Sequence, residues 1–330
     1  MIDLFSSIPV RLEGVTGSYI HAQVQMRARD LFTGLYHIGG TGQLALFFLK
    51  GKLVGVYRLT DGRWNCLPHP VWDETITGWA SGDLRELGLP EDGLRVCRLM
   101  LEADFGDSRT LPALRADELV PYLSKWHRAG KAGLALIRQS DFSAVMLLPA
   151  DSLEPTEGVL VSRFQLRTGP AVVTQVREWG DRPCLVTLCT HRDDSDAWKE
   201  YNLRVSFGAL VQRALKRYEE LAGRFLISDL GEQVNQETRS RGWAISLFGN
   251  SLSVRQYFQT ADSAGRAYAA LLAIMNGQMD SVVGGKMVES ILSAATVPLQ
   301  DEARTLLQDY VLSRVSSTRV AMNPSVPYAR

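Results

Sequence analysis

Residues 28–59, ARDLFTGLYHIGGTGQLALFFLKGKLVGVYRL, decide the fold class of the N-terminal half. An apolar stripe with helical spacing runs to Leu35, and Gly39-Gly40 can adopt the left-handed backbone with which helices end. Apolar runs over 44–49 and 53–59 predict two short strands, and Lys50-Gly51 between them is a hairpin turn. The stretch therefore predicts a helix followed by a β-hairpin.

The start of this helix allows two interpretations. Residues 20–26 alternate between apolar and polar, as a strand would. The helical stripe through Val24, Leu31 and Leu35 continues where the alternation stops. We therefore expect a helix from about Gln23 onward.

A looser copy of the stretch follows about ninety residues later. Residues 28–35 align with 116–123, residues 36–40 with 126–130, and residues 44–46 with 134–136. The second copy continues through a polar turn at 139–141 into a strand over 145–148. One hypothesis is two similar helix–hairpin units, 19–60 and 113–150, that share a sheet. The alternative is coincidence between two common supersecondary units.

Two further stretches complete the N-terminal region. Residues 60–110 hold many glycines and prolines, so we expect an irregular but ordered segment. Its Trp64, Trp72 and Trp79 are expected to pack under this segment, with an aromatic ligand cage as the alternative. Residues 159–166, 171–176 and 185–189 predict strands separated by strong turn signals.

The chain changes character near residue 191. The acidic run within 191–200 is interpreted as a solvated linker that caps the next helix, because it lacks the glycine and distal glutamate of a calcium-binding EF-hand loop. Residues 201–315 predict a helix-rich domain that begins with a long amphipathic helix over 201–225. A hairpin turn at Gly249-Asn250, a buried helix capped by Thr260 or Asp262, and helices over 282–295 and 299–315 follow. Residues 316–330 are expected to be a flexible tail.

These patterns predict an α+β chain. Residues 1–190 form a mixed N-terminal domain of helix-plus-β-hairpin units with antiparallel strands, and 201–315 form a helix-rich C-terminal domain with a small hairpin.

Composition restricts the classes of function. The 330 residues include 36 basic and 36 acidic side chains, so no overall field favours nucleic acid or an anionic membrane. No stretch is long and apolar enough for membrane insertion, and the start MIDLFSSIPVRLEGV does not resemble a signal peptide. We expect a cytoplasmic protein. Its four scattered cysteines are expected to be reduced, partly buried thiols.

The sequence predicts no catalytic, cofactor-binding or metal-binding residue, and no cofactor. Gly39-Gly40-Thr41-Gly42 follows a predicted helix and precedes a strand, which is the reverse of a phosphate-binding loop. His37 and His127 occupy similar places in the two copies, but a metal site needs three or four ligands. Histidines at helix ends that hydrogen-bond a carbonyl are the preferred interpretation.

One family resemblance covers about residues 19–150. Thr41-Gly42-Gln43-Leu44-Ala45-Leu46, followed by Gly51-Lys52-Leu53-Val54-Gly55-Val56, resembles the core of the bacterial PATAN-type domain, found at the N-terminus of a heterocyst-patterning regulator. Val56 departs from the family, which has a small residue such as alanine near that place, and we identify no receiver domain within these 330 residues. The resemblance implies a non-catalytic interaction module in signalling, motility or differentiation. It assigns no functional residue.

The functional hypothesis is a cytoplasmic adaptor or scaffold. Its N-terminal domain would bind a protein partner, for which the resemblance suggests a response regulator, a small GTPase or a motor component. The helix over 201–225 is the candidate for homo-oligomer formation. One alternative is a structural subunit of a homo-oligomeric or polymeric assembly, and a second is a small-ligand sensor or cryptic enzyme.

Overall fold

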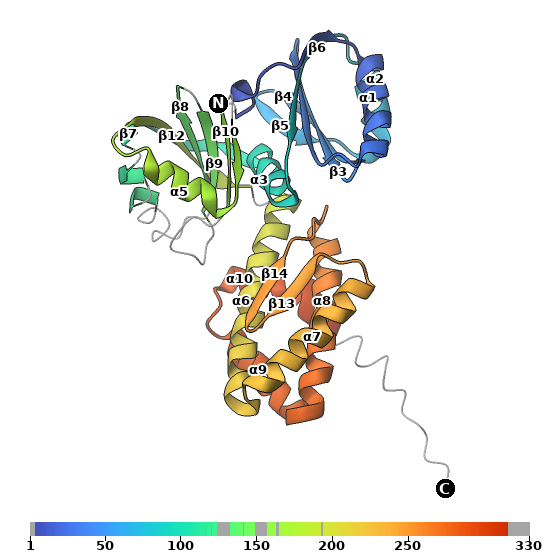
Figure 1. Ribbon diagram of the computed structural model, residues 1–330, viewed down its shortest axis with the longest axis vertical. Coiled ribbons are helices and arrows are strands. Elements are labelled where there is room, and N and C mark those ends of the chain that lie inside the picture. Colours follow the sequence, from blue (N-terminus) through green and yellow to red (C-terminus); the bar gives the residue numbers. More distant parts are fainter. Residues whose placement is uncertain are drawn as a thin grey trace. The chain divides into compact units, whose positions relative to one another are not determined.

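The computed structural model describes residues 4–115, 117–119, 121–123, 133–140, 142–148, 157–162, 165–192 and 194–315. The chain forms two compact units that divide between Ser195 and Asp196. The first unit combines antiparallel sheets with helices, and the second is helix-rich with a small hairpin (Figure 1). This arrangement confirms the predicted α+β class.

The first sheet has six antiparallel strands in the order β1-β6-β2-β3-β4-β5. The strands are β1 (Leu12–Val15), β2 (Gly34–Gly40), β3 (Gln43–Leu49), β4 (Lys52–Thr60), β5 (Arg63–Cys66) and β6 (Gly82–Gly88). Two helices lie together on one face of this sheet, α1 (Gly17–Asp30) and α2 (Trp72–Thr77) (Figure 1). The short helix η2 (His69–Val71) precedes α2. Ile20 and Ile76 from these two helices join the apolar core of that face.

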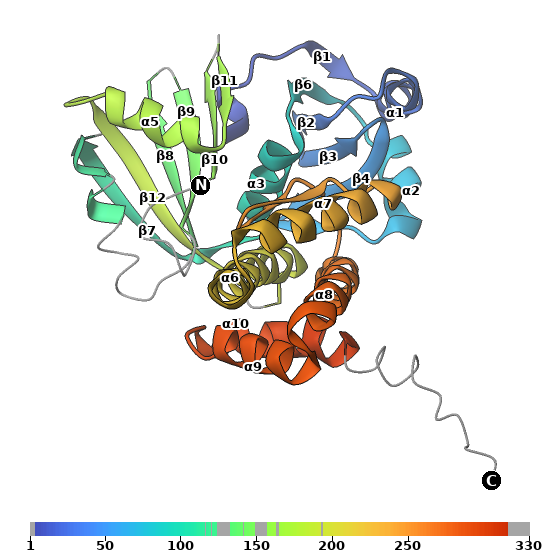
Figure 2. The same cartoon turned by 60° about the horizontal axis from the view of Figure 1, so that its bottom comes forward.

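The second sheet also has six antiparallel strands, in the order β11-β10-β9-β8-β12-β7. The strands are β7 (Ala103–Arg115), β8 (Gly133–Gln139), β9 (Phe142–Leu148), β10 (Gly158–Ser162), β11 (Leu166–Thr168) and β12 (Pro183–His191). Helix α5 (Pro170–Glu178) covers one face (Figure 2). Leu119 and Leu123, from the helical residues 117–119 and 121–123, join the same core.

The two sheets share one topology. If each strand of the first sheet is replaced by the strand numbered six higher, its order becomes β7-β12-β8-β9-β10-β11. This is the order of the second sheet read from its other edge, and every pairing in both sheets is antiparallel. Gly34 and Gly133 occupy the same place, because each begins the strand that pairs with β6 or β12. An added Cβ would lie 2.2 Å from the Leu87 oxygen at Gly34 and 2.1 Å from the Cys189 oxygen at Gly133. The structural repeat is thus a whole six-stranded unit.

The sequence alignment of the two copies is wrong in register. It pairs residues 44–46 of β3 with 134–136 of β8, whereas the structural counterpart of β8 is β2. The error arises because both strands contain the run Leu-Ala-Leu. Residues 126–130, which the alignment also uses, lie outside the described residues.

The predicted first helix is also placed wrongly. It begins earlier, at Gly17, and ends at Asp30, because Leu31 adopts a left-handed backbone with φ of 52°. Leu35 therefore belongs to β2, and Gly39-Gly40 end a strand instead of a helix. The predicted hairpin is confirmed, with Lys50 and Gly51 both at positive φ in the turn between β3 and β4.

Two other expectations fail for local reasons. Residues 60–110 are regular, because their prolines and glycines mark element ends: Gly78 ends α2 and Pro90 precedes α3 (Glu91–Leu101). Residues 171–176 are helical within α5, because Val172 and Val176 also fit a helical face and pack on the sheet. A short apolar run does not by itself distinguish the two structures.

Helix α3 and the N-terminal segment link the two sheets. Residues 93–101 of α3 are all buried, and the helix contacts β2 and β5 of the first sheet and β9 and β10 of the second. The short helix η1 (Leu4–Ser7) contacts β9 and β10, where the Ser7 and Ser143 hydroxyl oxygens lie 2.7 Å apart. Leu4 and Phe5 are fully buried.

The second unit is a helical core with one hairpin. Its elements are α6 (Asp196–Ala222), α7 (Arg224–Ser240), β13 (Ile245–Phe248), β14 (Ser251–Val254), α8 (Ala261–Val283), α9 (Gly285–Thr296), α10 (Asp301–Leu307) and the π-helical turn η3 (Gln308–Leu312). The apolar stripe of α6, from Leu203 to Tyr218, is buried in the core of this unit. The predicted helix over 201–225 is interrupted at Gly223, whose φ is 89°, so Phe225 belongs to α7.

We expect Gly34→Ala to destabilise the chain by about 3 kcal/mol or more, because the new Cβ would overlap the backbone of β6 as well as strain a positive φ. Gly62→Ala is the matched control, since φ is 75° there but nothing lies within 4 Å. It should cost only about 1 kcal/mol. Urea denaturation of both variants measures the difference, and equal losses would contradict a role for close strand approach.

Candidate interaction surfaces

The glycine-rich turn Gly39 to Gly42 is structural. It joins β2 to β3, and the Gly40 N–H donates to the Gly42 oxygen at 2.9 Å. A Cβ at Gly40 would lie 2.6 Å from the Ser81 oxygen, so glycine is needed for close approach. The turn leads into a strand, not into the helix that a phosphate-binding loop requires.

His37 is a core residue. It lies in β2, is buried, and stacks on Phe5 with ring centroids 4.4 Å apart. The expected helix-end role is wrong, because no helix ends there. His127 lies outside the described residues, and within the described part of the chain no cluster of three or more metal-ligating side chains exists.

Most of the tryptophans and cysteines singled out in the sequence pack as core residues, but Trp79 is only half-buried and Cys66 is exposed. Trp64 and Trp72 are buried, and the Trp72 indole N–H donates to the Leu67 oxygen at 2.8 Å. All four cysteines are free thiols, and burial raises the pKa of Cys97 and of Cys189 to about 12. These two thiols therefore stay protonated and unreactive at neutral pH. Among the described residues, no helix has the length and apolar character needed to cross a membrane.

The acidic run near residue 191 divides between two roles. Arg192 and Asp194 form an ion pair at 2.9 Å. Asp196 begins α6, and its carboxylate accepts the N–H of Ala261 at 3.3 Å, so it caps the start of α8.

A buried polar network gathers around Glu102. Its carboxylate accepts the Tyr57 hydroxyl at 2.6 Å, the Arg98 Nε at 3.2 Å and the Ser195 hydroxyl at 2.7 Å. Strand β4, helix α3 and the segment after β12 supply these groups, so the network joins both copies of the repeat. Buried hydrogen bonds to a charged group are among the stronger stabilising contacts.

The outer face of α1 exposes apolar side chains. Tyr19, Ala22 and Met26 are exposed and lie at helical spacing on one side of the helix. Leu31 follows at the end of the helix and is 67% exposed despite its left-handed backbone. Its left-handed backbone ends α1, and its side chain extends the exposed apolar face of the helix.

Arg27 clamps this helix onto the first sheet. Its guanidinium donates to the Tyr36 hydroxyl, to Glu86 at 2.7 Å and to Asp30 at 2.5 Å. It also lies 4.5 Å from the centre of the Phe32 ring. Burial raises the pKa of Tyr36, so its hydroxyl stays neutral next to Arg27. The exposed face of α1 is consequently held in one orientation.

The second unit exposes two phenylalanines near the end of α6. Phe225 is 77% exposed and Phe248 is 68% exposed. The Asn235 amide group holds the hairpin on α7, because it accepts the Leu247 N–H at 2.7 Å and donates to the Leu247 oxygen at 2.9 Å. The Asn250 amide donates to Glu219 of α6 at 2.7 Å.

Sequence reasoning missed these exposed residues. The predicted amphipathic helix over 201–225 runs without a break to Phe225, but in the structure Gly223 ends the helix and Phe225 is exposed. Phe248 follows the buried Ile245 and Leu247 in β13, and strand alternation places it on the other face. Two features of the sequence could have predicted this exposure: the helix-ending Gly223, and the alternation of side chains between the two faces of β13.

A polar groove of about 660 Å³ lies between α7 and α8 of the second unit. Three glutamines, Gln233, Gln236 and Gln278, line it with the small residues Ala273 and Gly277. Glu237 at its edge is already paired with Arg241 at 2.8 Å. The groove offers amide hydrogen-bond groups and no arrangement of catalytic side chains.

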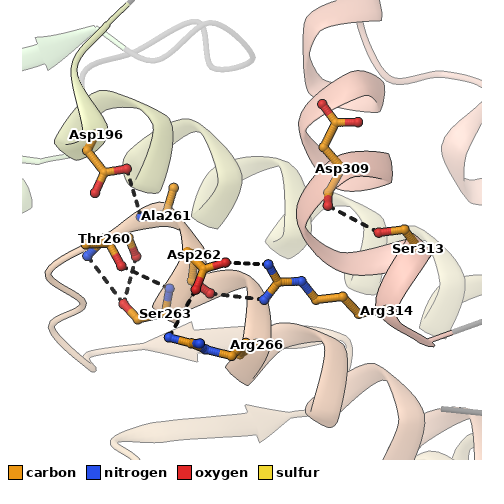
Figure 3. A network of polar contacts seen from close by, with 9 residues as sticks. All are labelled: Asp196, Thr260, Ala261, Asp262, Ser263, Arg266, Asp309, Ser313 and Arg314. Carbon is orange, nitrogen blue, oxygen red and sulfur yellow. Dashed lines mark hydrogen bonds and ion pairs between the residues drawn. The ribbon is translucent and has the colours of Figure 1, made fainter. Parts of the chain in front are cut away.

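A charged network fixes the start of α8 (Figure 3). Thr260 caps the helix through a reciprocal pair of hydrogen bonds with Ser263. Asp262 pairs with Arg314, near the end of the described chain, and with Arg266 at 3.0 Å. The hydrogen bond from Arg314 lowers the pKa of Asp262 below its usual value.

Comparisons of the chain with protein-family models, with curated proteins and with solved structures found no match.

We expect Tyr57→Phe to lower the free energy of unfolding by roughly 1.5–3 kcal/mol, because Glu102 loses a buried hydroxyl donor. Tyr19→Phe is the control, since Tyr19 is exposed, and it should change stability by less than about 0.5 kcal/mol. Urea denaturation of the full chain gives both values. Similar losses in the two variants would exclude a role for the network.

We expect the Asp262→Asn variant to be less stable than the native chain at neutral pH, because the pair with Arg314 is lost. A depressed carboxyl pKa stabilises the folded state above the unfolded pKa of about 3.8, and this contribution disappears as pH falls through the folded pKa. The stabilities of the two proteins should therefore converge below about pH 4. Thermal unfolding between pH 2 and 7 tests this, and a constant difference would contradict it.

Proposed function

We propose that the chain is a non-catalytic cytoplasmic adaptor or scaffold that acts through protein–protein interaction. The observation that supports this most directly is the exposed apolar face of α1, made of Tyr19, Ala22, Met26 and Leu31. Its buried side is held on the sheet by Arg27, which donates to Tyr36 of β2 and to Glu86 of β6. A preorganised apolar helix face loses little entropy when a protein partner covers it.

The chemistry of this face favours a protein over a small molecule. Met and Tyr are side chains that protein interfaces use often, because they supply contact area and adapt to a partner surface. Asp30 and Arg29 at the end of α1 would supply a polar rim. A rim of this kind contributes to specificity more than to affinity.

The resemblance to PATAN-type domains supports the same class of function. It suggests a role in bacterial signalling, motility or differentiation, with a response regulator, a small GTPase or a motor component as the proposed partner. Residues 41–56, which carry the resemblance, form β3, most of β4 and the turns around them. The turn glycine Gly51 is packed on the backbone of α1, since a Cβ there would lie 2.5 Å from the Arg27 oxygen. The motif thus supports the helix that carries the exposed face.

Affinity purification of the tagged full chain from its native host, with quantitative mass spectrometry, tests the proposal. We expect one protein partner at an amount comparable to the chain. The Tyr19→Ser/Met26→Ser variant should lose at least about 90% of it, equivalent to about 1.4 kcal/mol or more.

Gln25→Ser is the matched control, because Gln25 is an exposed polar residue on the same helix. It should retain the partner. Absence of any stoichiometric protein with the native chain, or unchanged recovery with the double variant, would contradict the proposal.

A further inference from the structure

Helices α6 and α8 of the second unit run in the same direction. The start of α6 bonds to the start of α8 through Asp196 and Ala261. Further along both helices, the Phe207 and Tyr268 rings stack with centroids 4.6 Å apart. Figure 1 shows the two helices extending from these contacts toward the same end of the unit.

Both helices end at a glycine, at the same level. Gly223 follows α6 with φ of 89°, and Gly284 follows α8 with φ of 80°. Each glycine is sixteen residues beyond its member of the stacked pair, which corresponds to about 24 Å of helix. The chain therefore makes two corresponding corners, α6 to α7 and α8 to α9, at one end of the unit.

Each corner exposes an apolar side chain on either side of its glycine. Leu221 and Phe225 flank Gly223, and Val282 and Met287 flank Gly284. Phe248 adds a fifth, because its hairpin turn is bonded to Glu219 in the last turn of α6. We call these five residues the distal patch, and their exposed fractions lie between 42% and 77%.

The distal patch is large enough for a protein contact. With about 200 Å² for a large side chain, the exposed parts of the five residues add up to roughly 560 Å² of apolar surface. A stable interface covers about 800 Å² on each partner, of which a little over half is apolar. The patch would supply the apolar share of one such interface.

The charges around the patch favour an identical partner. Lys216, Arg217, Arg224 and Lys286 lie near the two glycines, as do Glu219, Glu220, Asp280 and Glu289. A strongly acidic or basic partner would meet charges of its own sign. A twofold contact brings the same mixed-charge surface of both copies together, so that basic groups of one copy can pair with acidic groups of the other. With 36 basic and 36 acidic residues, two copies also do not repel each other at long range.

We propose that the distal patch binds the distal patch of a second copy of this chain, which makes a twofold homodimer. This inference does not depend on the partner surface proposed for α1, because it uses other residues and another partner. It moves the homo-oligomer contact expected along helix 201–225 to the end of that helix, since the rest of its apolar stripe is buried in the unit's own core.

Sedimentation velocity of the purified full chain over a concentration series tests the inference. We expect a species of twice 36.6 kDa that dissociates on dilution. The Phe225→Ser/Phe248→Ser variant should sediment as a monomer, with a dissociation constant raised at least tenfold. Both phenylalanines are mostly exposed, so neither substitution removes a core contact.

Val297→Ser is the matched control, because Val297 is 68% exposed but lies outside the distal patch. It should dimerise as the native chain does. A native chain that stays at 36.6 kDa, a dimer that the double variant retains, or a patch occupied by a different protein would each overturn the inference.

Discussion

The central strands of both sheets are buried on both faces, and the first unit depends on this constraint. Strands β2, β3, β8 and β9 have almost no exposed residue away from their ends. Each sheet needs a cover on either side, because an apolar strand face left in water costs about 25 cal/mol per Å². Helices α1, α2 and α5 cover the outer faces, and α3 with η1 fills the space between the sheets. This explains why α3 is buried along nearly its whole length.

The two copies of the repeat share their topology but differ in one polar cluster. Tyr36 of β2 meets Arg27, and Glu86 of β6 completes the cluster. The place of Tyr36 in the second copy is taken by Ala135, which belongs to the apolar core of the second sheet. A buried polar cluster stabilises only when its groups are paired, and it orients side chains more precisely than an apolar contact does. The first copy therefore holds α1 in a fixed orientation.

The second unit uses glycines to change the direction of its helices. Gly223 and Gly284 adopt backbone conformations that other residues rarely reach, so each helix stops where the glycine stands. Residues immediately after each glycine leave the helical stripe that precedes it. Phe225 and Met287 are thereby exposed, although their spacing in the sequence suits a buried position. The same two glycines thus end the helices of the fold and expose the apolar residues of the distal patch.

Local sequence chemistry determined the α+β class, the hairpins at Lys50-Gly51 and Gly249-Asn250, the Thr260 cap and the long α6 stripe. These features depend on contacts within a few residues, which the sequence shows directly. Only the tertiary structure decided that 171–176 is helical, that Leu35 belongs to a strand, and that whole six-stranded units repeat. Short apolar runs fit either secondary structure, so packing against distant strands determines the choice. For the same reason the exposed faces of α1 and of the distal patch could not be predicted, because exposure depends on what the rest of the chain leaves uncovered.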